Sequence, residues 1–88
     1  MIVESVGKVE IELGLNENEG RAEIMFHLRM DHDGDGLTEL TGPYYSVLGM
    51  TKAFPNYRQE ILTASRAFLS RNLPADHRRR LERAIALA

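Results

Sequence analysis

Two stretches of this chain alternate apolar and polar residues, and this alternation constrains the fold more than any other feature. Apolar side chains stand at every second position from Val9 to Leu15 and again from Ala22 to Met30. Successive side chains of a strand point to opposite faces, so a period of two predicts half-buried strands at 9–15 and 22–30. Residues 16–20 are polar, end in Gly20 and predict a hairpin loop between the strands.

A two-stranded hairpin alone is marginally stable in water, so other elements must cover its apolar face. Asp33-Gly34 and Asp35-Gly36 are typical turn sequences, and residues 37–41 after them predict a short third strand. The apolar faces coincide when odd positions of the first strand oppose even positions of the second. One such register places Glu10 opposite His27.

Each expected helix of the second half begins at a proline, which suits the first position of a helix. The sequence predicts helices over 43–53, 55–72 and 74–87, with a broad apolar face on the middle one. The predicted fold is therefore α+β: an N-terminal antiparallel β-hairpin or three-stranded meander packed against two or three C-terminal helices.

The charge of the chain divides at the Gly42-Pro43 step. Residues 1–42 hold ten acidic and three basic residues, a net charge of -7, whereas residues 43–88 hold three acidic and eight basic residues, a net charge of +5. A chain of 88 residues has room for one domain only. We therefore expect a single domain over 1–88, with an acidic β part (1–42) and a basic helical part (43–88).

The composition excludes several classes of chemistry. The chain has no Cys, which excludes disulfides, zinc–thiolate sites and cysteine nucleophiles. No Ser-His-Asp arrangement and no phosphate-binding glycine loop can be recognised, so we expect no enzymatic activity. No apolar run approaches the ~18–20 residues of a membrane span, and the first residues do not resemble a signal peptide. These observations favour a cytoplasmic protein without a membrane partner.

The run Asp31-His32-Asp33-Gly34-Asp35-Gly36 is the most specific string in the chain. It resembles the first half of the calcium-binding loop of EF-hand proteins, in which acids at positions 1, 3 and 5 precede a glycine at position 6. The resemblance implies calcium ligands at Asp31, Asp33, Asp35, the Leu37 carbonyl and Glu39. Gly42 occupies position 12, where the family has a bidentate Glu, which favours the alternative of a solvated Asp-Gly turn without a cofactor.

The C-terminal half carries a group of arginines that is a candidate partner-binding surface: Arg78, Arg79, Arg80 and Arg83. Such a face can neutralise phosphates. However, the chain as a whole is acidic, with a pI of about 5.9, and no aromatic residues stand between these arginines to stack on bases. We therefore expect a solvated face, or one that meets an acidic hairpin, rather than a nucleic-acid site.

Two further groups of apolar residues remain to be placed. Tyr44, Tyr45 and Tyr57 either line a small pocket with Met50 and Phe54 or belong to the core, and such clusters are more often core. The middle helix is apolar over an arc that one hairpin cannot cover, so we expect a homo-oligomer, with a dimer the commonest closed form. Phe68 and Leu69 are the residues expected at or beside its interface.

Together these features favour a non-enzymatic protein-interaction module that self-associates and acts as an adaptor, a regulator or a small inhibitor of a larger assembly. Two alternatives stay open: a weakly calcium-responsive module that uses the Asp31–Asp35 loop, and a nucleic-acid-binding accessory protein that uses the arginine face.

Overall fold

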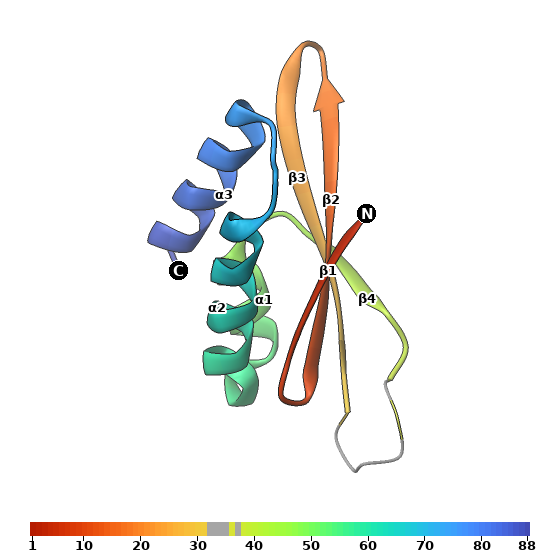
Figure 1. The fold of residues 1–88 in the computed structure, drawn as a ribbon. Helices are drawn as coiled ribbons and strands as arrows, with labels where there is room; N and C mark the ends of the chain where they lie inside the picture. Colours follow the sequence, from red (N-terminus) through yellow and green to blue (C-terminus); the bar gives the residue numbers. More distant parts are fainter. Residues whose placement is uncertain (32–35, 37) are drawn as a thin grey trace.

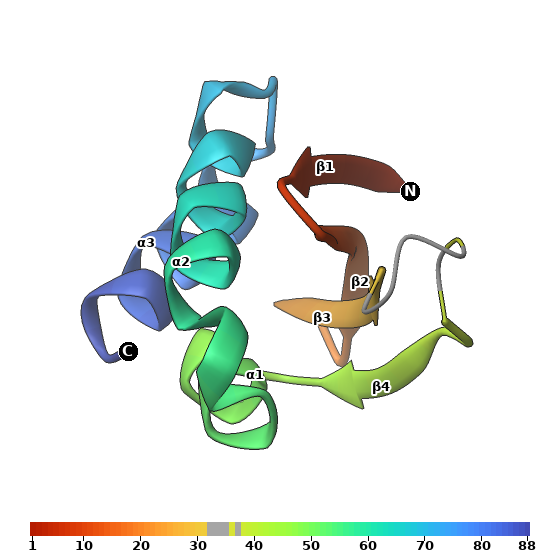
Figure 2. The same ribbon diagram turned by 90° about the horizontal axis from the view of Figure 1, so that it is seen from below.

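The computed structural model describes residues 1–31, 36 and 38–88. An antiparallel sheet forms one layer and the helices form a second layer on one of its faces (Figures 1 and 2). The fold is therefore α+β, as the sequence predicts. The sheet has four strands in the order β1-β2-β3-β4, one more than the largest sheet expected. They are β1 (Ile2–Val6), β2 (Val9–Asn18), β3 (Arg21–Met30) and β4 (Thr41–Tyr44).

The strand β1 is the element that the sequence does not predict. It pairs with β2 from Ile2 opposite Leu13 to Val6 opposite Val9. Its core-facing positions include Glu4, so its apolar pattern is broken at the centre. The reason for Glu4 lies outside the strand, because the carboxylate pairs with Arg71 at 3.4 Å.

The β2–β3 hairpin is longer and tighter than the expected one. Asn18 pairs with Arg21, so the turn consists of Glu19 and Gly20 alone. Both have positive φ angles, 54° and 77°, as a type I′ turn requires. The predicted loop over 16–20 and the predicted register are therefore wrong.

The observed register differs from the predicted one by two residues, which leaves every side chain on its expected face. Glu12 now lies opposite His27, and Glu10 lies opposite Arg29. On the uncovered face of the sheet, Arg29 lies 3.3 Å from a carboxylate oxygen of each of the two glutamates. The register that forms therefore places a cation between two acids.

The third predicted strand and the first predicted helix are both displaced along the chain. The strand is β4 rather than 37–41, and Leu37 lies outside the described residues. Pro43 lies in β4 instead of beginning a helix. The preceding Gly42 has a φ of 125°, and a Cβ there would lie 2.8 Å from the Phe26 carbonyl oxygen, so only glycine lets β4 approach β3 so closely.

The helices are α1 (Val47–Ala53), α2 (Arg58–Ala67) and α3 (Ala75–Ala86), with single 3₁₀ turns at η1 (Pro55–Tyr57) and η2 (Phe68–Ser70). The helix α1 begins after Ser46, whose hydroxyl accepts a hydrogen bond from the Gly49 N–H at 2.9 Å. The predicted helix over 55–72 is divided into η1, α2 and η2. The helix α2 lies against β1 and β2, and α3 lies against β3.

The core lies between the sheet and the helices, and it is formed by the residues that the alternation places inward. The fully buried large side chains include Ile11, Leu13, Phe26 and Leu28 from the sheet. From the helical half they include Val47, Met50, Ile61, Phe68 and Leu81. A single copy of the chain therefore encloses a continuous apolar core.

Candidate functional site

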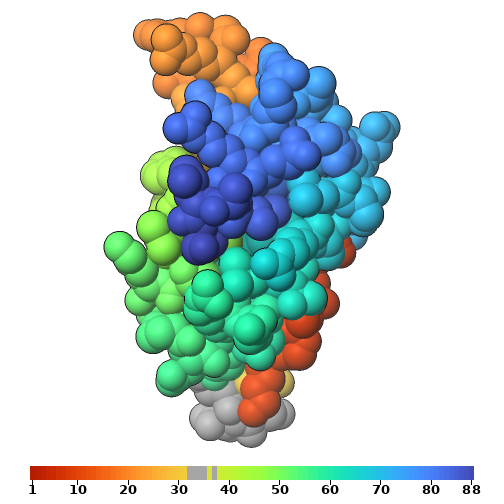
Figure 3. All heavy atoms as spheres, turned by 90° about the vertical axis from the view of Figure 1, so that its left-hand side faces the viewer, coloured from red at the N-terminus to blue at the C-terminus, as the bar shows by residue number. Residues whose placement is uncertain are grey.

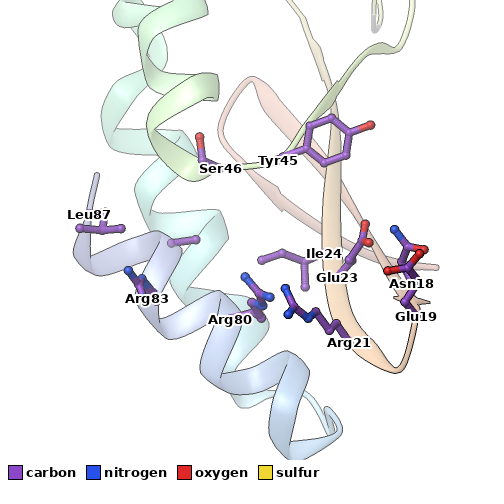
Figure 4. A pocket seen from close by; sticks show the side chains of 11 residues that line it. Asn18, Glu19, Arg21, Glu23, Ile24, Tyr45, Ser46, Arg80, Arg83 and Leu87 are labelled. Carbon is purple, nitrogen blue, oxygen red and sulfur yellow. The ribbon is translucent and has the colours of Figure 1, made fainter.

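A hollow of about 470 Å³ lies between α3, the end of the β2–β3 hairpin and the segment that joins β4 to α1 (Figure 4). On one face of the molecule, the hairpin end lies beside α3, and the segment before α1 lies beside the C-terminal end of α3 (Figure 3). We call this hollow the α3 groove. It is lined by Asn18, Glu19, Arg21, Glu23, Ile24, Tyr45, Ser46, Arg80, Arg83, Ala84 and Leu87.

One wall of the groove is formed by the side of α3 that carries Arg80 and Arg83. Residues three, four and seven apart share a face of a helix, so Arg80, Arg83 and Leu87 lie along one side of α3. Leu81, one residue further around the helix than Arg80, is fully buried in the core. The opposite wall contributes Arg21 from the first position of β3, and Figure 4 shows the Arg21 and Arg80 side chains extending toward one another.

The four arginines predicted to form one surface have different surroundings. Arg80 and Arg83 line the groove. Arg79 lies at its edge, in a second hollow that Arg21 and Arg80 also line, and it is paired with Asp76. Arg78 points elsewhere, because its guanidinium donates hydrogen bonds to the carbonyl oxygens of Leu69 and Arg71. Arg78 therefore holds α3 against η2. The arginines that line the groove are Arg21, Arg80 and Arg83, and we call them the basic cluster.

Sequence analysis missed Arg21 because it belongs to the acidic half of the chain. The signal that was available is its position directly after the Glu19-Gly20 turn, where the first residue of a strand lies exposed at the turn end of a hairpin. Only the packing of α3 beside that end brings Arg21 to Arg80, which is 59 residues away along the chain.

Glu19 and Glu23 line the same hollow, but no ion pair forms with its arginines among the described residues. The ion pairs within the described part of the chain engage Arg29, Arg71 and Arg79, and none engages Arg21, Arg80 or Arg83. Arg21, Arg80 and Arg83 are all exposed. Neighbouring guanidinium groups repel one another, and a carboxylate or phosphate placed between them accepts charge-assisted hydrogen bonds from their forked donors. The groove is therefore suited to an anionic group.

The other end of the groove is apolar. Tyr45 and Leu87 are each 64% exposed, and Figure 4 shows them on opposite sides of the hollow. Ile24 and Ala84 add further apolar lining to the hollow. Of the aromatic and methionine cluster predicted as core or pocket, Met50 is fully buried, and Tyr44 packs edge-on against Phe54 with ring centroids 6.4 Å apart. Tyr45 is the member of that cluster that lines the groove.

The predicted calcium loop is only partly described. Asp33, Asp35 and Leu37 lie outside the described residues, so the arrangement of the ligand set is not tested. Asp31 and Glu39 flank that segment, and the Asp31 N–H donates to the Lys8 carbonyl oxygen at 2.8 Å. No group of three His, Asp or Glu residues within 1–31, 36 and 38–88 is arranged to hold a metal ion. Calcium binding stays a prediction.

Phe68 and Leu69 were expected at a contact between two copies. Phe68 is 0% exposed, so its side chain has no surface to offer a second copy. The arc of the middle helix that one hairpin cannot cover is covered instead by β1, which the sequence did not predict, and by α1. Leu69 is half-buried against the core. The packing reason for association is therefore removed, while the oligomeric state itself stays a prediction.

Comparison with known proteins finds no relative: no protein-family model matches the chain, and no curated protein and no solved structure is significantly similar to it. Among the described helices, none combines the length and the apolar character needed to cross a membrane.

Proposed function

We propose that this chain is a non-enzymatic protein-interaction module that binds an acidic segment of a partner protein in the α3 groove. In that role it acts as an adaptor, a regulator or a small inhibitor of a larger assembly. The observation that carries the proposal is the convergence of Arg21, Arg80 and Arg83, none of which has an ion-pair partner among the described residues, around one hollow. Carboxylates of a partner supply the missing counter-charge.

The composition of the groove favours an acidic peptide over a nucleic acid. Glu19 and Glu23 line the same hollow as the arginines. A polyphosphate backbone carries closely and regularly spaced charges and would meet these two carboxylates, whereas a peptide can place its few acids beside the arginines only. Tyr45 is the sole aromatic residue of the groove, which provides little stacking surface for a run of bases.

The edges of the sheet support this choice of surface. A partner can also bind a sheet by adding a strand to a free edge. At the β1 edge, Arg71 donates a hydrogen bond to the Val3 carbonyl oxygen at 3.0 Å, which occupies part of that edge. At the opposite edge, β4 has four residues and includes Pro43, which lacks a backbone N–H. Both edges are poor templates for strand addition, so we assign partner binding to the groove.

Binding of a fluorescein-labelled peptide that carries two Glu residues in a Gly-Ser background, followed by fluorescence anisotropy at low salt, tests the proposal. We expect saturable binding that weakens about tenfold or more, a loss of about 1.4 kcal/mol, in the double variant Arg80→Gln/Arg83→Gln. The matched control is Arg58→Gln/Arg66→Gln, which removes the same charge from exposed positions of α2 outside the groove.

Three results would contradict the proposal: no binding of the acidic peptide, equal weakening in the α2 control, or stronger binding of polyuridylate RNA than of the peptide. The last result would favour the nucleic-acid alternative. A calorimetric titration with calcium tests the calcium-responsive alternative separately, with Asp33→Ala and Asp35→Ala as the variants expected to abolish any heat. The cytoplasmic location stays a prediction from the sequence.

A further inference from the structure

We propose that the α3 groove selects a segment in which a bulky apolar residue follows or precedes an acidic residue at a separation of two or three positions. This inference rests on the proposed function and names the occupant more closely: an acidic side chain pairs with the arginines, and a Leu or Phe side chain lies between Tyr45 and Leu87.

The exposure of Tyr45 and Leu87 supports the expectation that the occupant carries an apolar residue. Apart from Met1, Tyr45 and Leu87 are the most exposed large apolar side chains among the described residues, at 64% each. Both line the same hollow, and so do the apolar residues Ile24 and Ala84. Exposed apolar residues scattered singly need no explanation, but two that face one hollow form a site for an apolar side chain. Burial there removes water from the guanidinium groups nearby and strengthens their pairing with a carboxylate.

The spacing follows from the geometry of α3. A helix rises about 1.5 Å per residue, so Leu87 lies about 6 Å along the axis from Arg83 and about 10 Å from Arg80. An extended peptide advances about 3.3 Å per residue, so these separations correspond to about two or three residues of the occupant. A peptide that carries its acid and its apolar residue at this separation reaches both ends of the groove at once, whereas a peptide with distant groups engages one end only.

Three labelled peptides test the inference on the full chain by fluorescence anisotropy. The first has one Phe two residues from a Glu and a Gly-Ser segment after them. The second has the same residues in another order, so that the Gly-Ser segment separates the Phe from every Glu. The third replaces the Phe with Ser. We expect the first peptide to bind about tenfold more tightly than the other two, the gain typical of burying part of an apolar side chain.

Two variants locate the effect. Leu87→Ser and Tyr45→Ser are expected to abolish the advantage of the first peptide and to leave the affinity for the third unchanged. Both residues are largely exposed, so the fold persists, as a thermal melt verifies. The matched control is Leu40→Ser, an apolar side chain that is 39% exposed and lines neither hollow.

Each outcome decides between the two proposals. Equal affinity for the first and second peptides overturns the spacing inference and leaves the proposed function standing. Binding of a Phe-containing peptide without acids, undiminished by Arg80→Gln/Arg83→Gln, overturns both. Failure of every peptide to bind also overturns both. If sedimentation shows a dimer that Leu87→Ser dissociates, the occupant of the apolar end is a second copy of the chain, and the inference is wrong.

Discussion

The Nε2 atom of His77, in the first turn of α3, lies 2.8 Å from the backbone carbonyl oxygen of Asn16 on β2. Because a carbonyl oxygen only accepts, Nε2 carries the hydrogen and donates the hydrogen bond. The imidazole is buried, and its Nδ1 atom has no hydrogen-bond partner within the described part of the chain. This contact ties the start of α3 to the hairpin, and the packing of α3 against β3 and the buried Leu81 add to it in positioning the two walls of the α3 groove.

Replacement of His77 by Ala is expected to loosen both the fold and the groove. The change removes one hydrogen bond and the whole buried imidazole ring, so we expect the free energy of unfolding to fall by about 1–3 kcal/mol. Urea denaturation measures this change. Glu82→Ala, on the exposed side of α3, is the control and should alter stability by less than about 0.5 kcal/mol. Equal effects of the two changes would show that the His77–Asn16 contact does not hold α3 in place.

Arg78 and Arg80 should respond in opposite ways to replacement by Gln. Arg78 donates to two backbone carbonyls, one of them in Arg71 at 2.6 Å, so Arg78→Gln is expected to lower the free energy of unfolding by about 1 kcal/mol. Arg80→Gln should leave stability within about 0.5 kcal/mol and weaken binding of the acidic peptide. Urea denaturation and anisotropy on the same two variants separate these roles. Loss of peptide binding in Arg78→Gln with an intact fold would contradict the assignment.

Phe68→Ala should be among the most destabilising changes in the chain. The side chain is fully buried, and its removal leaves a cavity that costs about 3–5 kcal/mol. A small domain is stable by only about 5–15 kcal/mol, so this variant is expected to melt at a much lower temperature.

Light scattering then addresses self-association independently of stability. A dimer gives twice the 10.0 kDa chain mass. Because Phe68 is buried within one chain, a milder change at the same site, Phe68→Leu, should retain whatever mass the unmodified protein shows. A change of mass with an unchanged melting temperature would indicate that Phe68 does contribute to a contact between copies.

Arg71 is expected to protect the sheet from pairing with other molecules. Its guanidinium contacts the Val3 carbonyl oxygen and the Glu4 carboxylate at the edge of β1. Arg71→Ala removes an exposed ion pair, so stability should fall by no more than about 1 kcal/mol. The exposed edge is expected to promote slow association, measured by light scattering during storage. Arg66→Ala is the control, and equal association of the two variants would show that Arg71 does not guard the edge.

The alternation of apolar and polar residues and the positions of proline and glycine predicted the parts of the fold that depend on neighbouring residues. The core faces of β2 and β3 follow from the alternation between Val9 and Met30, because a strand orients side chains by local geometry alone. Likewise α3 begins one residue after Pro74. The strand β1 was not predicted although it adjoins β2 through a two-residue turn, because Glu4 breaks its apolar pattern. Where the chain depends on a distant partner, the prediction was wrong: Pro43 lies in a strand because Gly42 fits against Phe26.

The sequence by itself determined the class of the fold, the inward-facing residues of the hairpin and the division of charge between the two halves. The first two depend on the order of residues over a few turns or pleats, and the third is a count of charged residues in each half. Only the tertiary structure decided which arginines act together, because Arg21 and Arg80 meet through the packing of α3 beside the hairpin end. It also decided that Arg78 and Phe68 serve the fold of a single chain. The burial of a side chain and the meeting of two distant side chains depend on contacts between segments that are far apart in the chain. The order of residue types along the sequence does not specify these contacts.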